Sequence, residues 1–156
     1  YINKFVGDAV VVVVGFPRSE EDTAMRAVLA ALDVHEGVKD LRERWAREGK
    51  AGLEGLRMGI NTGEVSVSYQ GSSKRQLDIL GENMDLAARL EDAARGFDAV
   101  ALLGVRTHEL VKDRVHAQCV SVSLKNLPHV TTAWALEGIV EAPSTDDASM
   151  HLAARR

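Results

Sequence analysis

Five charged residues lie within or beside apolar strand-like or helical segments, which would hold their side chains in a fixed position for binding or catalysis. Lys4 is the only charge in an apolar stretch at the start of the chain, and Asp8 interrupts the apolar run that continues to residue 16. Asp78 has apolar neighbours on both sides. Asp85 and Arg89 are four residues apart, a spacing that places two side chains on one face of a helix.

Each of these residues has an ordinary structural interpretation beside a functional one. Asp8 is either a solvated turn aspartate or a carboxylate for a divalent cation, since Mg²⁺ takes one or two carboxylates together with substrate phosphates. Lys4 is either at an exposed strand position or a cation inside a pocket. Asp78 is either on an exposed strand face or buried with a partner, because an unpaired buried carboxylate is costly. Asp85 and Arg89 could form a surface ion pair.

The composition limits the class of protein. The chain has 156 residues, of which 46% are hydrophobic and 27% charged, and its formal net charge is -4. These values are typical of a globular domain with a core, and the acidic balance disfavours general nucleic-acid binding, which needs a basic face. A small phosphate ligand needs only a few local cations and stays open.

The one cysteine and the apolar runs bear on the cellular setting. Cys119 is the single cysteine, so no intrachain disulfide can form, and a reduced, cytoplasmic location is expected. Its ordinary interpretation is a small hydrophobic residue in a strand. No apolar run reaches the roughly 18 residues of a membrane span, and no signal peptide is visible.

Hydrophobic patterning predicts the elements that position these residues. Valine-rich and alternating stretches indicate strands, and apolar residues at three- and four-residue steps indicate amphipathic helices. The consecutive valines within 9–16 are typical of a strand covered on both faces. A helix start is expected at Ser19, followed by acidic residues. The predicted strands are 1–5, 9–16, 56–61, 64–69, 99–103, 115–124 and 132–137, and the predicted helices are 19–48, 84–94 and 107–111. Residues 77–80 are a further short apolar stretch.

The element order ββαββαβαββ has no strict βαβ alternation, which favours an α+β sandwich with a sheet on one side and helices on the other. The first and second strands are expected to form a hairpin around Gly7-Asp8, and the third and fourth a pair around Thr62-Gly63. We expect one domain over residues 1–140. Residues 141–156 lose the pattern and are expected to be a flexible tail or linker.

Four stretches, taken in order, carry a family resemblance. They are "KFVGDAV", "GINTGEVSVSYQGSSK", "LDILGENMDLAARLE" and "LKNLP". Together they resemble the catalytic domain of class III nucleotidyl cyclases, from Tyr1 to about Leu136. The resemblance implies a ferredoxin-like, palm-type antiparallel sheet with helices packed on one side. The family's first strand and first metal aspartate precede the "KFVGDA" hairpin, so the domain is expected to be N-terminally incomplete as written.

The resemblance implies a role for three of the five residues that can be checked against chemistry. Asp8 falls on a metal-binding aspartate, and Lys4 and Asp78 fall on the two positions that read the purine. Lysine only donates hydrogen bonds and an ionised aspartate only accepts them. Adenine offers an acceptor at N1 and a donor at its 6-amino group, whereas guanine presents the reverse pattern and would leave both groups unpaired. The implied substrate is therefore ATP.

The remaining site residues follow from the same resemblance. Arg89 falls on the arginine that stabilises charge on the reacting phosphate, for which its fork of donors is suited. Asp85 stands where the family has an asparagine that orients the ribose; an aspartate cannot donate to a hydroxyl and could instead pair with Arg89, so weakened catalysis is expected. Lys125 and Lys74 are candidate phosphate-binding lysines.

The implied reaction is attack of the ATP 3'-hydroxyl on the α-phosphorus, giving 3',5'-cyclic AMP and pyrophosphate with two Mg²⁺ or Mn²⁺ ions per site. In the family, the metal aspartates come from one subunit and the purine-reading and helix residues from the other, which implies a homodimer. The alternative is a catalytically impaired cyclase-like module that binds nucleotide, dimerises and regulates a partner. Sensory or membrane segments are commonly fused upstream in this family.

Overall fold

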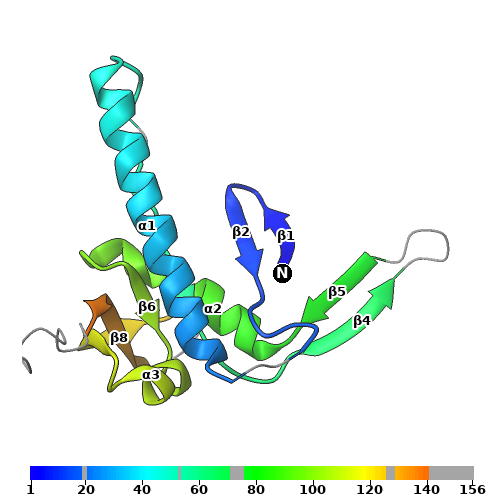
Figure 1. Ribbon diagram of the computed structural model, residues 1–156. Helices are drawn as coiled ribbons and strands as arrows, with labels where there is room; N and C mark the ends of the chain where they lie inside the picture. The colour runs from blue at the N-terminus through cyan, green and yellow to red at the C-terminus, as the bar shows by residue number, and fades with distance from the viewer. Residues whose placement is uncertain (19–20, 53, 71–75, 126–128, 141–156) are drawn as a thin grey trace, which may run out of the picture.

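The computed structural model describes residues 1–18, 21–52, 54–70, 76–125 and 129–140 (Figure 1). The helices are α1 (Thr23–Arg47), α2 (Glu82–Ala93) and α3 (Val105–Val111), and a 3-10 turn η1 (Ala94–Gly96) follows α2. The strands are β1 (Ile2–Val6), β2 (Ala9–Val12), β3 (Gly59–Ile60), β4 (Ser66–Gln70), β5 (Gln76–Leu80), β6 (Ala101–Leu103), β7 (Val115–Ser123) and β8 (Val130–Ile139). The predicted tail, 141–156, lies outside the described residues.

The strands form a four-stranded central sheet and two separate hairpins. The central sheet has the order β3-β6-β8-β7, with β3 parallel to β6 and the other pairs antiparallel. The hairpins are β1–β2 and β4–β5. Mixed helices and mainly antiparallel strands confirm the predicted α+β class.

Helices cover both faces of the central sheet, which corrects the expectation that they pack on one side. Leu103 of β6 points into a core formed with α1 and α3, where Val28 and Val111 are buried. Its neighbour Leu102 points to the opposite face, where it packs in a second core with Leu90 of α2. Adjacent strand residues face opposite sides of a sheet, so this short, fully buried strand needs a helix on each side.

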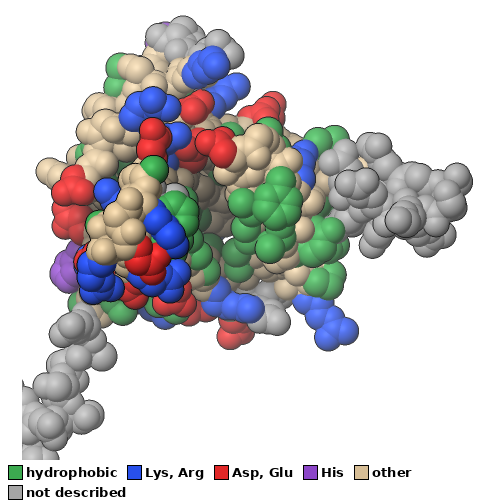
Figure 2. All heavy atoms as spheres, turned by 90° about the horizontal axis from the view of Figure 1, so that it is seen from above, with side chains coloured by type: hydrophobic (Ala, Val, Ile, Leu, Met, Phe, Trp, Pro, Cys, Tyr) green, Lys and Arg blue, Asp and Glu red, His purple; other side chains and the backbone are tan. Residues whose placement is uncertain are grey.

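The hairpin β1–β2 turns at Gly7-Asp8 as predicted, but it is shorter and less covered than its valine run suggested. The second strand ends at Val12 rather than at residue 16. The side chain of Phe5 is 73% exposed, and Val10 and Val12 are also more than half exposed, so this strand is not covered on both faces. Figure 2 shows hydrophobic side chains gathered over this part of the molecule.

The predicted strand pair around Thr62-Gly63 is wrong. Its first strand, β3, pairs with β6 of the central sheet, and its second, β4, pairs with β5. The chain therefore passes from one sheet to another at this turn. Thr62 explains part of the change of direction, because its hydroxyl bonds the hydroxyl of Thr107, which in turn donates to the carbonyl oxygen of Ile60.

The long helix α1 begins later than expected. Its N-cap residue is Asp22, with φ of 65°, and no side-chain hydrogen bond caps the helix there. The Asp22 carboxylate instead accepts a 2.6 Å hydrogen bond from Arg114, ahead of β7. Ser19, the predicted cap, lies outside the described residues. Within the part of the chain that the structure describes, no helix is both long and apolar enough to cross a membrane.

Candidate functional site

Lys4 and Asp8 lie on the hairpin β1–β2, in different surroundings. Asp8 is exposed at the turn, beside Gly7, whose φ of 61° favours glycine. Lys4 is half-buried in β1 and is paired with Val11 in the hairpin register. In Figure 1, this turn points away from the central sheet, so the hairpin presents Asp8 at its tip and Lys4 along its length.

Asp78 belongs to a strand that contacts the strand carrying Lys4. It lies in β5, opposite Ser68 of β4. The strands β1 and β5 contact one another although about seventy residues separate them in the sequence. The fold thus brings together the two strands that hold the predicted purine-reading residues.

Asp85 and Arg89 lie on α2, as predicted, but do not pair. Asp85 is exposed in the first turn, and Arg89 is half-buried one turn later. Among the described residues, no ion pair joins the two, although their four-residue spacing would allow one. The expected neutralisation of Arg89 by Asp85 is therefore absent.

Of the two candidate phosphate-binding lysines, the structure describes one. Lys125 is exposed just after β7. Lys74 lies outside the described residues, so its prediction stays untested. The candidate site thus draws its described residues from β1, the hairpin turn, β5, α2 and the segment just after β7.

The helix α2 lies unusually close to β3. A Cβ added at Gly59 would lie 2.2 Å from the carbonyl oxygen of Ala87 and 2.5 Å from the backbone nitrogen of Glu91. An ion pair lies beside this contact, in which Arg57 Nε donates a hydrogen bond to Glu91 Oε1 at 2.9 Å. Only glycine allows the helix backbone to approach the strand in this way.

A pair of asparagines connects the start of α2 to the turn after β3. Asn61 Nδ2 donates to Asn83 Oδ1 at 2.9 Å and to the Asn83 carbonyl oxygen at 3.2 Å. Asn83 Nδ2 donates to the carbonyl oxygen of Glu64 at 2.9 Å. These three hydrogen bonds fix the end of the helix that carries Asp85.

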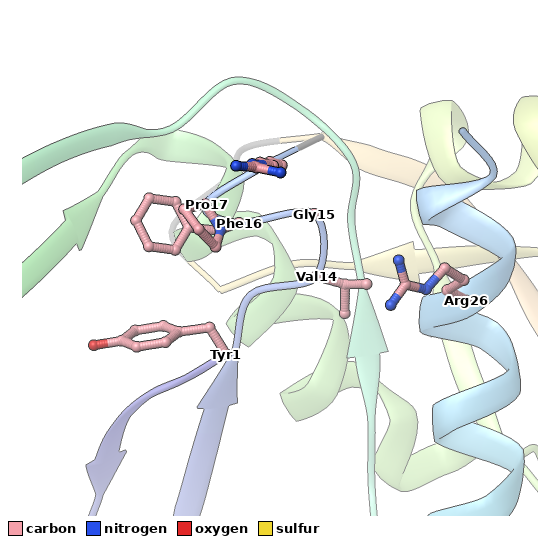
Figure 3. Close-up of a pocket in the computed structure, with 7 residues that line it drawn as sticks. Tyr1, Val14, Gly15, Phe16, Pro17 and Arg26 are labelled. Atoms are coloured by element: carbon pink, nitrogen blue, oxygen red, sulfur yellow. The ribbon is translucent and has the colours of Figure 1, made fainter. Parts of the chain in front are cut away.

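A cavity of about 220 Å³ lies elsewhere, where the hairpin β1–β2 leads into α1. Figure 3 shows the ring of Tyr1 near Phe16 and Pro17, with Arg26 of α1 extending its guanidinium toward Val14. The Tyr1 and Phe16 rings meet edge to face, with centroids 5.6 Å apart. None of the residues singled out from the sequence lines this cavity, so it does not carry the candidate site.

The metal requirement of the site is only partly met by the described residues. Nowhere in the described ranges do three or more His, Cys, Asp or Glu side chains come together as a metal site. Asp8 is the one predicted metal ligand, and it stands at the exposed turn. A two-ion site needs further carboxylates, so these residues do not by themselves fit the two ions that the resemblance implies.

Comparison with known proteins now identifies the family. The family model described as "Adenylate and Guanylate cyclase catalytic domain" matches residues 2–130. The chain therefore belongs to the class III adenylate and guanylate cyclase catalytic domains, a family that uses divalent metal ions. No curated protein matches the chain.

Solved structures of both nucleotide preferences are similar to this chain. The guanylyl cyclase Cya2 is 28% identical with a TM-score of 0.77, over 92% of this chain and 73% of that one. The adenylyl cyclase CyaB from P. aeruginosa is 28% identical with a TM-score of 0.75, over 92% and 72%. A rhodopsin-guanylyl cyclase catalytic core with converted specificity, in complex with ATPalphaS, is 25% identical with a TM-score of 0.71, over 88% and 71%.

Sequence reasoning did not single out the residues that fix α2. Asn61 and Asn83 lie just outside a strand and within the first turn of a helix, and nothing in their local sequence links them. A weak signal was present at Gly59 and Gly63, since two glycines this close to a strand indicate a close approach of another backbone. Only the structure shows that the approaching element is α2.

Proposed function

We propose that this domain is an adenylate cyclase, which converts ATP to 3',5'-cyclic AMP and pyrophosphate. The 3'-hydroxyl loses its proton and attacks the α-phosphorus, forming the cyclic diester. The bond from the α-phosphorus to the bridging oxygen of the β-phosphate breaks, and pyrophosphate leaves. The family membership supports a nucleotidyl cyclase, and the choice of ATP is argued from the residues of this chain.

The contact between β1 and β5 is the observation that carries the choice of ATP. Lys4 belongs to one of these two strands and Asp78 to the other. A donor-only lysine and an acceptor-only aspartate match N1 and the 6-amino group of adenine. Guanine would set donor against donor and acceptor against acceptor, which is a strong basis for rejection in a site that excludes water.

Arg89 is proposed to bind the reacting phosphate. It is half-buried and is not paired with Asp85, so its guanidinium donors can serve an anionic ligand. Charge that develops on the phosphate oxygens in the transition state would be stabilised by donors already held in place. Asp85, exposed in the same helix, is proposed to accept a hydrogen bond from a ribose hydroxyl.

A homodimer is part of the proposal. The hairpin β1–β2 exposes several large apolar side chains, namely Ile2, Phe5, Val6, Val10 and Val12. An apolar surface of this kind is typical of a protein–protein interface. We propose that a second copy covers it, so that Asp8 and Lys4 serve two different sites. A cytoplasmic setting is also proposed, on the basis of the single cysteine.

A catalytically impaired module is the second candidate, and Asp85 favours it. A carboxylate at this position cannot donate to a ribose hydroxyl and adds negative charge beside a polyphosphate. Such a module would still bind nucleotide and dimerise, and its output would be an effect on a partner.

The two candidates are separated by turnover of ATP and GTP, each with Mg²⁺ or Mn²⁺ present. The proposed enzyme forms cyclic AMP in a metal-dependent reaction, prefers ATP to GTP, and loses the activity in an Asp8→Ala variant. Nucleotide binding without a cyclic product would support the impaired module instead. Equal rates with ATP and GTP would contradict the assignment of Lys4 and Asp78 to the purine.

A further inference from the structure

We propose that Asn61 and Asn83 are positioning residues, which set the orientation of α2 and thereby of Asp85 and Arg89 toward the nucleotide. This inference rests on the proposed function. It starts from the three hydrogen bonds that join Asn61, Asn83 and the Glu64 carbonyl oxygen. These bonds link the turn between two sheets to the first turn of the helix.

The start of α2 has little else to hold it. Its N-cap residue is Gly81, which has no side chain to bind the free N–H groups, and no side-chain hydrogen bond caps the helix. The backbone N–H groups of Met84 and Asp85 reach only the Gly81 carbonyl oxygen, at 3.0 and 3.4 Å. The asparagine pair does not bind these N–H groups; it holds the first turn of the helix to the segment after β3 through side-chain amide donors.

The geometry of the helix explains why this matters for the site. Successive residues are about 100° apart around a helix, so Asn83, Ala87 and Glu91 share the face that meets the turn and β3. Asp85 is two residues from Asn83, roughly 200° around the axis, and therefore points away from β3. Any rotation of the anchored face turns Asp85 and Arg89 by the same angle.

Two anchors hold different parts of the helix. Gly59 and the Arg57–Glu91 pair act on the second half of α2. The asparagine pair acts on the first turn, where Asp85 lies. Loss of the pair is therefore expected to free the end of the helix near Asp85 without detaching the helix from the sheet.

The turn is shaped around the asparagine side chain. A Cβ at Gly63 would lie 2.2 Å from Cγ of Asn83, so this glycine leaves the space that the amide occupies. Asn83 uses its oxygen as an acceptor and its nitrogen as a donor. Only an amide provides both at this size.

The chain offers a matched control for the loss of one side-chain bond. Thr62 is adjacent to Asn61 in the same turn, and its hydroxyl bonds Thr107 of α3 rather than α2. Thr62→Val removes that bond and leaves the asparagine pair intact. Asn61→Ala and Asn83→Ala remove the contacts to α2.

The first test is steady-state kinetics with ATP in wild-type protein, the two alanine variants and Thr62→Val. Asn61→Ala and Asn83→Ala are expected to lower kcat by about tenfold and to change KM less than about twofold, because a misplaced Arg89 loses contacts made in the transition state. Thr62→Val is expected to keep the wild-type kcat. An equal loss in Thr62→Val, or unchanged kcat in both alanine variants, would overturn the proposal.

A double-mutant cycle separates positioning from general destabilisation. In an Arg89→Ala background, Asn83→Ala is expected to lower kcat by less than about twofold, since the group it positions is already absent. A factor equal to that in the wild-type background would show that Asn83 does not act through Arg89. Asn83→Ser serves as a second variant if the alanine variant does not fold.

Amide hydrogen exchange tests the structural step without any turnover. The N–H groups of Met84 and Asp85 are expected to exchange at least about fivefold faster in Asn61→Ala than in wild-type or Thr62→Val protein. Unchanged exchange would overturn the positioning role. If the wild-type protein turns over neither ATP nor GTP, the proposed function fails, and faster exchange would still support the structural role of the pair.

Discussion

The imidazole of His108 lies flat on the indole of Trp134, with ring centroids 4.2 Å apart and an interplanar angle of 6°. This stack joins α3 to β8 of the central sheet. Burial lowers the pKa of His108 from its usual 6.5; the positive charge of Lys112 lowers it further, and Glu109 acts in the opposite direction. The folded state thus favours the neutral imidazole.

The first prediction is a loss of stability on acidification. Because the folded-state pKa is lowered, the unfolded chain binds more protons once the pH falls below 6.5, so the stabilisation is present above that pH and is lost below it. We expect the thermal unfolding midpoint to fall between pH 7.5 and 5.5. His108→Phe keeps an aromatic stack and cannot titrate, so its midpoint should fall less; parallel curves would contradict the assignment.

The second prediction concerns Asp85. Replacing it with asparagine restores a donor for the ribose hydroxyl and removes a negative charge next to the polyphosphate. We expect Asp85→Asn to raise the rate of cyclic AMP formation by roughly tenfold, near the upper end of the ~0.5–1.5 kcal/mol that a neutral hydrogen bond contributes. Glu82→Gln removes an exposed charge from the same turn and is the control. Unchanged or lower turnover in Asp85→Asn would contradict the prediction.

The third prediction is a change of base preference when the purine-reading charges are exchanged. In the double variant Lys4→Glu, Asp78→Lys, an acceptor faces the guanine N1–H and a donor faces O6. We expect the ratio of kcat/KM for ATP over GTP to fall by at least about tenfold, since a hydrogen bond to a charged group contributes about 1.5–3 kcal/mol.

The control for this exchange is a pair of opposite charges away from the site. Arg106 and Glu109 form an exposed ion pair on α3 at 3.2 Å. Arg106→Glu, Glu109→Arg exchanges two charges in the same manner and should leave the base preference as it was. A similar shift in both double variants would point to the overall field of the protein rather than to contacts with the base.

The fourth prediction tests the apolar hairpin as a dimer surface. Phe5 is 73% exposed in β1. Phe5→Glu is expected to weaken self-association and to lower cyclase activity in parallel, because a charge at the interface core must be desolvated. Sedimentation velocity measures the association. Leu110→Glu places the same charge on an exposed residue of α3 and should alter neither property; equal association of wild type and Phe5→Glu would exclude this surface.

The sequence predicted best what depends on local pattern and on the order of motifs. The hairpin turn at Gly7-Asp8 and the helix with Asp85 and Arg89 are both present, because turn chemistry and apolar periodicity act over a few residues. The pairing of β3 was predicted wrongly, because its partner strand β6 is about forty residues away in the sequence. Gly59 indicates that another backbone comes close, but it does not indicate which strand pairs with β3. The asparagine pair could not be predicted either, because Asn61 and Asn83 are also far apart in the sequence.

The last prediction concerns Gly59, where α2 and β3 touch. An alanine Cβ would lie 2.2 Å from a backbone oxygen of the helix, and a helix backbone cannot yield as a flexible side chain can. We expect Gly59→Ala to lower the free energy of unfolding by roughly 1–3 kcal/mol, the usual cost of overpacking. Gly37→Ala is the matched control, because it lies in α1 with no atom within 4 Å of the added carbon, and should instead stabilise the protein by about 0.5–1 kcal/mol. Chemical denaturation of the two variants measures both effects, and a Gly59→Ala variant as stable as wild type would mean that α2 can move away from β3 at little cost.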